Sequence, residues 1–99
     1  MINHVVLFKL KEFPVEEKTS ILAELKVKLE GLKNKIEVLK YIEVGINHEV
    51  ESKSFDLVLI SHFETLDDLE EYRVHPEHVK VAGRVGEVAA ARAAVDYVF

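Results

Sequence analysis

The sequence has no cysteine, and its 99 residues include only four glycines and two prolines. The lack of cysteine excludes disulfide bonds, thiolate zinc sites, thiol nucleophiles and iron–sulfur clusters held by this chain. The scarcity of glycine and proline, together with 48% apolar and 31% charged residues, indicates a compact fold rather than a disordered or fibrous one. At this length we expect a single domain over residues 1–99.

Long apolar runs and excess positive charge are also missing. No apolar run approaches the roughly 20 residues that a membrane helix needs, and the first residues do not resemble a signal sequence. The 13 basic and 18 acidic residues give a net charge of −5, so bulk electrostatics do not favour nucleic acid. We therefore expect a cytoplasmic protein that binds neither membranes nor nucleic acid.

The spacing of apolar residues predicts the elements of the first two thirds of the chain. Residues 4–11 are rich in β-formers and precede Pro14, which predicts a strand. Spacings of three and four predict a long helix over residues 15–34. Strict alternation predicts a strand over residues 41–48. Residues 55–63 are apolar on both parities, which predicts a central strand covered on both faces.

Capping and proline signals organise the last third. Thr65 followed by acidic residues is typical of a helix start, and that helix must end before Pro76. Pro76 suits the first position of another helix, which we expect to run to about Ala91. Residues 95–99 alternate and predict a last strand, with Asp96 on the parity opposite to the aromatic residues.

Gly83 and Gly86 lie inside the predicted last helix, where each costs about 1 kcal/mol relative to alanine. Two explanations fit. The helix approaches the sheet closely there, which we favour, or the small side chains leave room for a ligand.

The resulting order is β-α-β-β-α-β, which predicts an α+β fold of the ferredoxin-like type: a four-stranded antiparallel sheet with its helices on one face. The other face would expose apolar side chains, and a homodimer in which two sheets pack face to face would cover them. These side chains are Val5, Leu7, Val58, Ile60, Tyr97 and Phe99.

Three segments resemble a known family. They are residues 4–11 (HVVLFKLK), residues 72–79 (YRVHPEHV), which contain the specific His-Pro-x-His motif, and residues 95–97 (VDY). Together they are similar to the stress-responsive alpha/beta barrel (Dabb) domain of the dimeric α+β barrel superfamily, over essentially the whole chain. The resemblance implies a dimeric barrel made of two ferredoxin-like protomers.

The resemblance also implies roles for individual residues. A plant polyketide cyclase of this family, which forms olivetolic acid from a linear polyketide thioester, is similar at the His-Pro-x-His motif. Its catalytic tyrosine and base fall on Tyr72 and His78, and its first-strand histidine falls on His4. Leu57 stands where that cyclase has a second pocket histidine. The absence of tryptophan argues against the cofactor-free monooxygenases and haem-degrading enzymes of the same architecture.

The residues themselves allow this chemistry. His78 lies in the first turn after Pro76, where the helix dipole disfavours imidazolium and keeps the ring neutral. A neutral imidazole can take a proton from a carbon between two carbonyls while the Tyr72 phenol donates a hydrogen bond to the enolate oxygen. No metal or cofactor is needed. Alternatively, His78 caps the helix and Tyr72 packs in the core with its hydroxyl on a backbone carbonyl.

We expect a small apolar pocket between the sheet and its own helices, with Tyr72 and His78 at its mouth, suited to a small, mostly apolar carbonyl compound. The alternative is a non-catalytic, stress-related binding or structural dimer whose core is closed. The expected lining is His4, Val6, Phe8, Leu25, Val44, Ile46, Leu57, Leu59 and Val85.

The remaining histidines have simpler expected roles. His75 precedes a proline, so its backbone is extended and it suits a helix cap or turn, with an accessory role in the site as the alternative. His48 and His62 lie near strand ends, where solvent or dimer contacts are the default. His75, His78 and His4 could be read as metal ligands, but His75 precedes the proline break and points elsewhere, so we predict no metal site.

Overall fold

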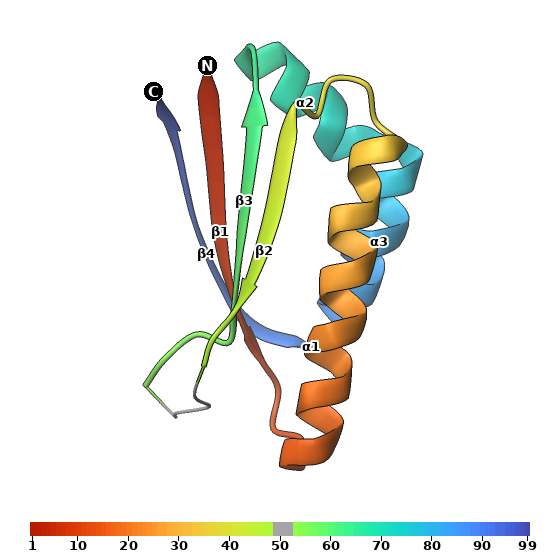
Figure 1. Ribbon diagram of the computed structural model, residues 1–99, viewed down its shortest axis with the longest axis vertical. Helices are drawn as coiled ribbons and strands as arrows, with labels where there is room; N and C mark the ends of the chain where they lie inside the picture. Colours follow the sequence, from red (N-terminus) through yellow and green to blue (C-terminus); the bar gives the residue numbers. More distant parts are fainter. Residues whose placement is uncertain (49–52) are drawn as a thin grey trace.

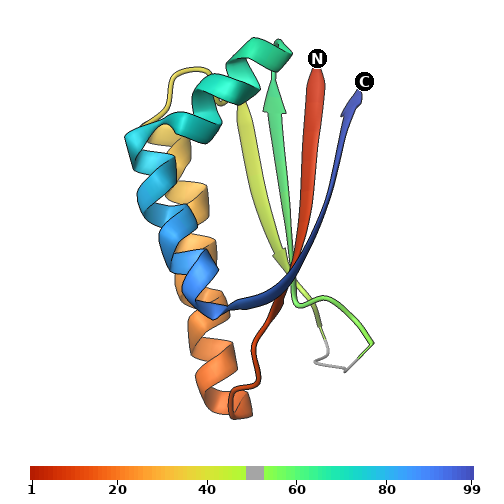
Figure 2. The ribbon, with the colours of Figure 1, turned by 180° about the vertical axis from the view of Figure 1, so that it is seen from behind.

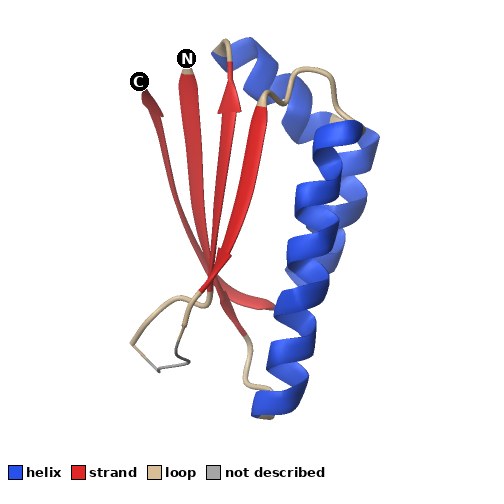
Figure 3. Ribbon diagram, in the orientation of Figure 1, coloured by secondary structure: helices blue, strands red, loops and turns tan. Residues whose placement is uncertain are grey.

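The computed structural model describes residues 1–48 and 53–99, which form one antiparallel sheet with all of its helices on one face (Figure 1, Figure 3). The predicted ferredoxin-like α+β fold is confirmed. The elements are β1 (Ile2–Leu10), α1 (Val15–Glu30), the 3-10 helix η1 (Gly31–Asn34), β2 (Tyr41–Ile46), β3 (Leu57–Phe63), α2 (Leu66–Val74), α3 (Pro76–Val88) and β4 (Ala89–Val98).

The sheet has the strand order β2-β3-β1-β4, so β1 is paired on both sides. Val6 lies opposite Leu59 of β3 and opposite Ala94 of β4, and both pairings are antiparallel. The first and last strands therefore run side by side, and the two chain ends meet at one edge of the molecule (Figure 2). Met1 and Phe99 exchange backbone hydrogen bonds there.

The core lies between this sheet and the helices. Alternate residues of β1 and β3 point towards the helices and are buried, among them Val6 and Leu59. α1 contributes its apolar stripe, in which Leu25 is completely buried. Exposed residues such as Val27 lie on the opposite side of that helix, as the spacing of three and four predicts.

The local signals around the last two helices have the predicted effect. The Thr65 hydroxyl accepts a hydrogen bond from the Asp68 N–H at 3.1 Å, as an N-cap does. The chain becomes extended at His75, and Pro76 is the first residue of α3. The Nδ1 atom of His75 accepts a hydrogen bond from the Glu77 N–H at 3.1 Å, so His75 caps α3.

The predicted end of the last helix is wrong. α3 ends at Val88, and β4 begins at Ala89 and includes all of residues 89–94. Alanine favours helix locally, but these residues pair with β1 along its length, and ladder formation with an established strand outweighs that weak preference. The chain turns directly from helix to strand, with the Lys11 N–H donating to the Val88 carbonyl at 2.8 Å.

Other boundaries shift by fewer residues. The predicted helix over residues 15–34 is α-helical to Glu30 and continues as the 3-10 turn η1. The predicted strands over residues 41–48 and 55–63 are each two residues shorter, so His48 lies beyond β2.

The favoured explanation of the two helical glycines is also wrong. A Cβ atom added at Gly83 or Gly86 would meet nothing within 4 Å, so neither position is a close contact between α3 and the sheet. Gly86 instead borders an open space described below. The close approach occurs in β2, where a Cβ on Gly45 would come within 2.9 Å of Val58.

None of the described helices or strands covers the outer face of the sheet (Figure 1). Val95 and Phe99 are more than half exposed. His62 stacks between Tyr41 and Phe99, with ring centroids 4.7 and 4.6 Å away, and this row of rings also faces outward. The apolar side chains that the sequence analysis assigned to this face are therefore available for contact.

No helix among the described residues is long and apolar enough to cross a bilayer.

One ion pair connects the two long helices. Arg84 of α3 donates two hydrogen bonds to the Glu24 carboxylate of α1, at 2.8 and 2.9 Å. The bonds from Arg84 and then Lys28 lower the pKa of Glu24 to about 2. An unfolded glutamate titrates near pH 4.5, so the ion pair contributes its full stabilisation of the fold above that pH. This stabilisation is lost as the pH falls towards 2, because Glu24 then becomes protonated in the folded chain as well.

We predict that Glu24→Gln lowers the free energy of unfolding at pH 7 by less than about 1 kcal/mol, because the pair is about one third exposed to solvent. At pH 2 the variant and the wild type should unfold at the same urea concentration. Glu37→Gln, at an exposed position outside the helices, is the control and should change neither value. An equal loss at both pH values would contradict an electrostatic role.

Candidate functional site

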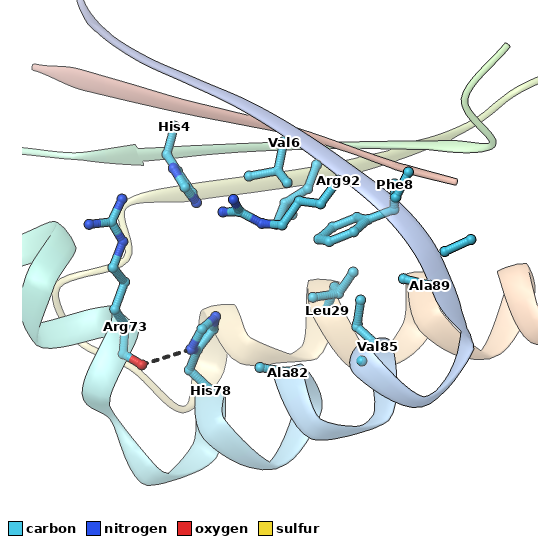
Figure 4. A pocket seen from close by; sticks show the side chains of 14 residues that line it. His4, Val6, Phe8, Leu29, Arg73, His78, Ala82, Val85, Ala89 and Arg92 are labelled. Carbon is cyan, nitrogen blue, oxygen red and sulfur yellow. Dashed lines mark hydrogen bonds between the residues drawn. The ribbon is translucent and has the colours of Figure 1, made fainter. Parts of the chain in front are cut away.

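A cavity of about 500 Å³ lies between the sheet and α3, bordered by the start of β4 (Figure 4). This volume is typical of small-molecule sites. An open cavity argues against the closed core that the structural alternative requires. Its lining comes from β1, α1, β3, α2, α3 and β4: His4, Val6, Phe8, Leu29, Leu59, Arg73, His78, Ala82, Val85, Gly86, Ala89, Ala90, Ala91 and Arg92.

Five residues belong to both the predicted and the observed lining. They are His4, Val6 and Phe8 of β1, Leu59 of β3 and Val85 of α3. Leu25, Val44 and Leu57 do not line the cavity, contrary to the prediction, because α1 packs directly on that half of the sheet and buries them in the core. Ile46 is 42% exposed and borders a separate hollow at the end of β2. Parity predicted which residues face inward, but not which half of the inner face stays open.

His78 faces the cavity from the first turn of α3 (Figure 4). Its Nδ1 atom lies 3.0 Å from the Arg73 carbonyl oxygen. A carbonyl can only accept, so the Nδ1–H donates and the neutral ring carries its lone pair on Nε2. Burial lowers the pKa of His78, and the hydrogen bond to Arg73 opposes that effect. The ring is therefore a neutral base at pH 7.

Tyr72 lies next to His78 but does not line the cavity, so its predicted place at the mouth is wrong. It is completely buried, with its ring 4.4 Å from the His78 ring and 4.9 Å from the Phe63 ring, measured between centroids. Its hydroxyl has no hydrogen-bond partner among the described residues, and a backbone carbonyl does not bind it. Burial raises the pKa of Tyr72 to about 12, which keeps the phenol protonated.

His4 faces the cavity from the opposite wall. It is buried, and its Nδ1 atom is hydrogen-bonded to a carboxylate oxygen of Asp96, its neighbour across the β1–β4 ladder. The other Asp96 oxygen accepts a hydrogen bond from Arg73 at 3.1 Å. Asp96 thus fixes the orientation of His4 and ties the end of α2 to β4, leaving Nε2 of His4 without a bond to any described residue.

Sequence reasoning missed Arg73, Arg92 and Asp96 as parts of this site. The only signal was the parity of Asp96, which is opposite to that of the aromatic residues of its strand. Arg92 fell between the predicted helix, which ended at about Ala91, and the predicted last strand, and its place on the inner face follows only from the pairing with Phe8.

The other histidines do not join the site. His75 caps α3 through Nδ1, and His62 lies on the outer face of the sheet. His48 is exposed beyond β2. No group of three or more side chains that could hold a metal ion occurs within residues 1–48 and 53–99.

The chain is similar to known proteins over its full length. The family described as Stress Responsive A/B Barrel Domain matches residues 2–99. No curated protein matches the chain.

Solved structures give the same fold. A dimeric protein of unknown function with a ferredoxin-like fold from Bacteroides fragilis is 41% identical, with 99% of this chain and 95% of that chain covered and a TM-score of 0.90. The protein At3g17210 from Arabidopsis thaliana is 27% identical, with 100% and 95% covered and a TM-score of 0.81. A hydroxynitrile lyase from Passiflora edulis is 16% identical, with 99% and 92% covered and a TM-score of 0.77, a likeness of fold alone.

The protonation state of His78 is directly testable. We expect nitrogen NMR of the ring to report a proton on Nδ1 and a lone pair on Nε2 at pH 7. Because burial lowers the pKa, the ring should gain its second proton at a lower pH than the same residue in urea-unfolded protein. A proton on Nε2 at pH 7 would contradict the hydrogen bond to Arg73, and a higher pKa in the folded chain would contradict the effect of burial.

Proposed function

Because the chain belongs to the stress responsive A/B barrel domain family, we propose that it binds a small, mostly apolar carbonyl compound and acts on it as a cofactor-independent cyclase or isomerase. His78 is the base and Tyr72 the hydrogen-bond donor. The observation that carries this proposal is the neutral imidazole of His78, which faces a largely apolar cavity with its Nε2 atom unbonded to any described residue.

The chemistry requires one proton transfer and one stabilised oxyanion. Nε2 of His78 takes the proton from a carbon flanked by carbonyls, and the C–H electron pair moves onto the carbonyl oxygen as an enolate. In a cyclase, the enolate carbon attacks a second carbonyl, whose oxygen then takes the proton from the imidazolium. In an isomerase, the imidazolium returns the proton to a different atom. Neither route needs a metal or an added cofactor.

The environment of Tyr72 supports the donor role. A buried hydroxyl without a partner costs about 1–3 kcal/mol, and a ligand oxygen that accepts from it would remove that cost. A phenol with a pKa of about 12 stays protonated at neutral pH and can donate but not act as a base. The contact between the Tyr72 and His78 rings, with centroids 4.4 Å apart, supports the pairing of this donor with this base.

We also propose that the protein is a homodimer through the outer sheet faces. The exposed apolar side chains of β4 and the half-buried outward ones of β1 and β3 support this, since a monomer rarely leaves such a surface open to water. The Bacteroides fragilis relative is described as dimeric. A two-fold axis would bring the two sheets face to face and leave both cavities on the helix sides.

The catalytic proposal predicts exchange of α-protons for deuterium. We expect wild-type protein to accelerate this exchange in a panel of β-diketones and β-keto thioesters, followed by proton NMR in heavy water. His78→Ala should slow it by about 100-fold or more, because general-base catalysis contributes that much. His75→Asn is the matched control: it removes a nearby histidine and keeps the cap of α3, so exchange should persist. No acceleration by wild type across the panel would leave a binding protein without this activity.

The substitution Tyr72→Phe separates the hydrogen bond proposed for the Tyr72 hydroxyl from the packing of the Tyr72 ring. The variant keeps the ring against His78 and removes a hydroxyl without a partner, so the free protein should be as stable as wild type or more stable by about 1 kcal/mol. Exchange should nevertheless slow by at least about tenfold, because an oxyanion donor is lost. Thermal unfolding and the same NMR assay measure the two effects. Unchanged exchange would show that Tyr72 only packs.

Ile60→Lys tests the dimer. Ile60 lies opposite Val5 in the middle of the outer face, and a charge there would be buried in the interface. Light scattering after gel filtration should give the mass of two 11.3-kDa chains for wild type and one for the variant. Val27→Lys, on the exposed side of α1, should remain a dimer. A monomeric wild type would overturn the proposed assembly.

A further inference from the structure

The cavity carries charge of one sign. Its lining includes two arginines and two histidines, and no described residue that lines it is acidic. The chain as a whole has 18 acidic and 13 basic side chains, for a net charge of −5. A cavity that excludes acidic groups in such a chain favours a ligand with negative charge.

Arg92 is the one arginine of the three that has no partner within the described residues. Arg73 is bonded to Asp96 and lies within 3.4 Å of Glu70. Arg84 makes ion pairs with Glu24 and Glu87. The positive charge of Arg92 is therefore not balanced by a carboxylate of the described residues.

The position of Arg92 directs that charge into the cavity. It pairs with Phe8 across the ladder, which places both side chains on the inner face of the sheet. Figure 4 shows the Arg92 side chain on the cavity side of β4, extending along the sheet towards the end of the cavity where His4 lies. The pKa of His78 is lowered mainly by burial, and the positive charges of Arg73 and Arg92 add to this, so the guanidinium lies within electrostatic reach of the base.

The remaining lining sets the shape of the ligand. Phe8, Leu29 and Val85 form an apolar end, away from His4 and Arg73 (Figure 4). Gly86 and the alanines at the start of β4 keep the space beside that end open. The cavity therefore matches a molecule with an apolar body and one anionic group.

We propose that the ligand is an organic monocarboxylate, whose carboxylate accepts two N–H hydrogen bonds from the Arg92 guanidinium while its apolar body packs against Phe8, Leu29 and Val85. This geometry is the preferred one between arginine and carboxylates. The inference rests on the proposed function for the carbonyl group. The substrate class is then an oxo acid, whose carbon next to the ketone faces His78.

The test compares acids with neutral molecules of the same shape. We would measure binding of 4-phenylbutanoate against 4-phenylbutanamide, and of octanoate against octanamide, by calorimetry at low salt. The wild type should bind an acid at least about tenfold more tightly than its amide. Arg92→Gln should reduce that ratio to about one, and Arg92→Lys should keep part of it because the charge remains. A comparison of the affinities for 4-phenylbutanoate and octanoate shows whether the cavity prefers an aromatic or an aliphatic body.

Arg84→Gln is the matched control, since Arg84 does not line the cavity, and the preference for acids should persist in it. Equal affinity for acid and amide in the wild type would overturn the inference, as would a preference that survives Arg92→Gln. Failure of both acids to bind at 10 mM would also overturn it.

These outcomes are separable from those of the exchange assay, which uses neutral diketones. If wild-type protein exchanges the diketones but shows no preference for acids, the monocarboxylate inference fails and the catalytic proposal stands. If acids bind through Arg92 but wild-type protein does not accelerate exchange, the role of Arg92 in binding a carboxylate stands and the catalytic role of His78 fails.

Discussion

The pairing of β1 with both β3 and β4 is the constraint on which the rest of the structure depends. It places the first and last strands of the chain side by side, with Ile2 opposite Val98. It forces residues 89–94 into a strand although their alanines favour a helix. It also positions the cavity, because the inner face of β1 supplies one wall and the start of β4 supplies the rim. Without the β1–β4 ladder, neither Asp96 nor Arg92 would face the site.

The two histidines of the cavity are both held through Nδ1, but by partners of different charge. His78 donates through Nδ1 to a backbone carbonyl, an uncharged partner that orients the ring and leaves it neutral. His4 is bonded through the same atom to Asp96, a carboxylate that Arg73 also binds. The site therefore has one ring beside a neutral partner and one beside a charged partner, with Nε2 of each ring unbonded to the described residues.

The fold could be predicted from the sequence because its signals are local and periodic. Thr65 and Pro76 mark helix starts by chemistry that acts within a few residues, and the apolar spacing separates helices from strands. The site could be predicted where it follows from strand parity, as for His4, and where the position after Pro76 and the family resemblance indicated it, as for His78. The predicted place of Tyr72 at the mouth, which followed the family resemblance, is wrong because α2 packs on β3 and buries the ring against Phe63. Arg92 was missed because its direction depends on a register between strands that lie about 80 residues apart in the chain.

The position of β4 at the edge of the sheet has a consequence for how the molecule forms. The β1–β4 pairing has the greatest sequence separation of any strand contact in the fold, so its loop-closure entropy is the largest that folding must overcome. A chain in which residues 1–88 have folded and β4 has not yet joined exposes the edge of β1, an apolar strand open to pairing with other chains. The same intermediate lacks one wall of the cavity. Docking of β4 on β1 therefore completes the cavity and covers the edge of β1 at the same time.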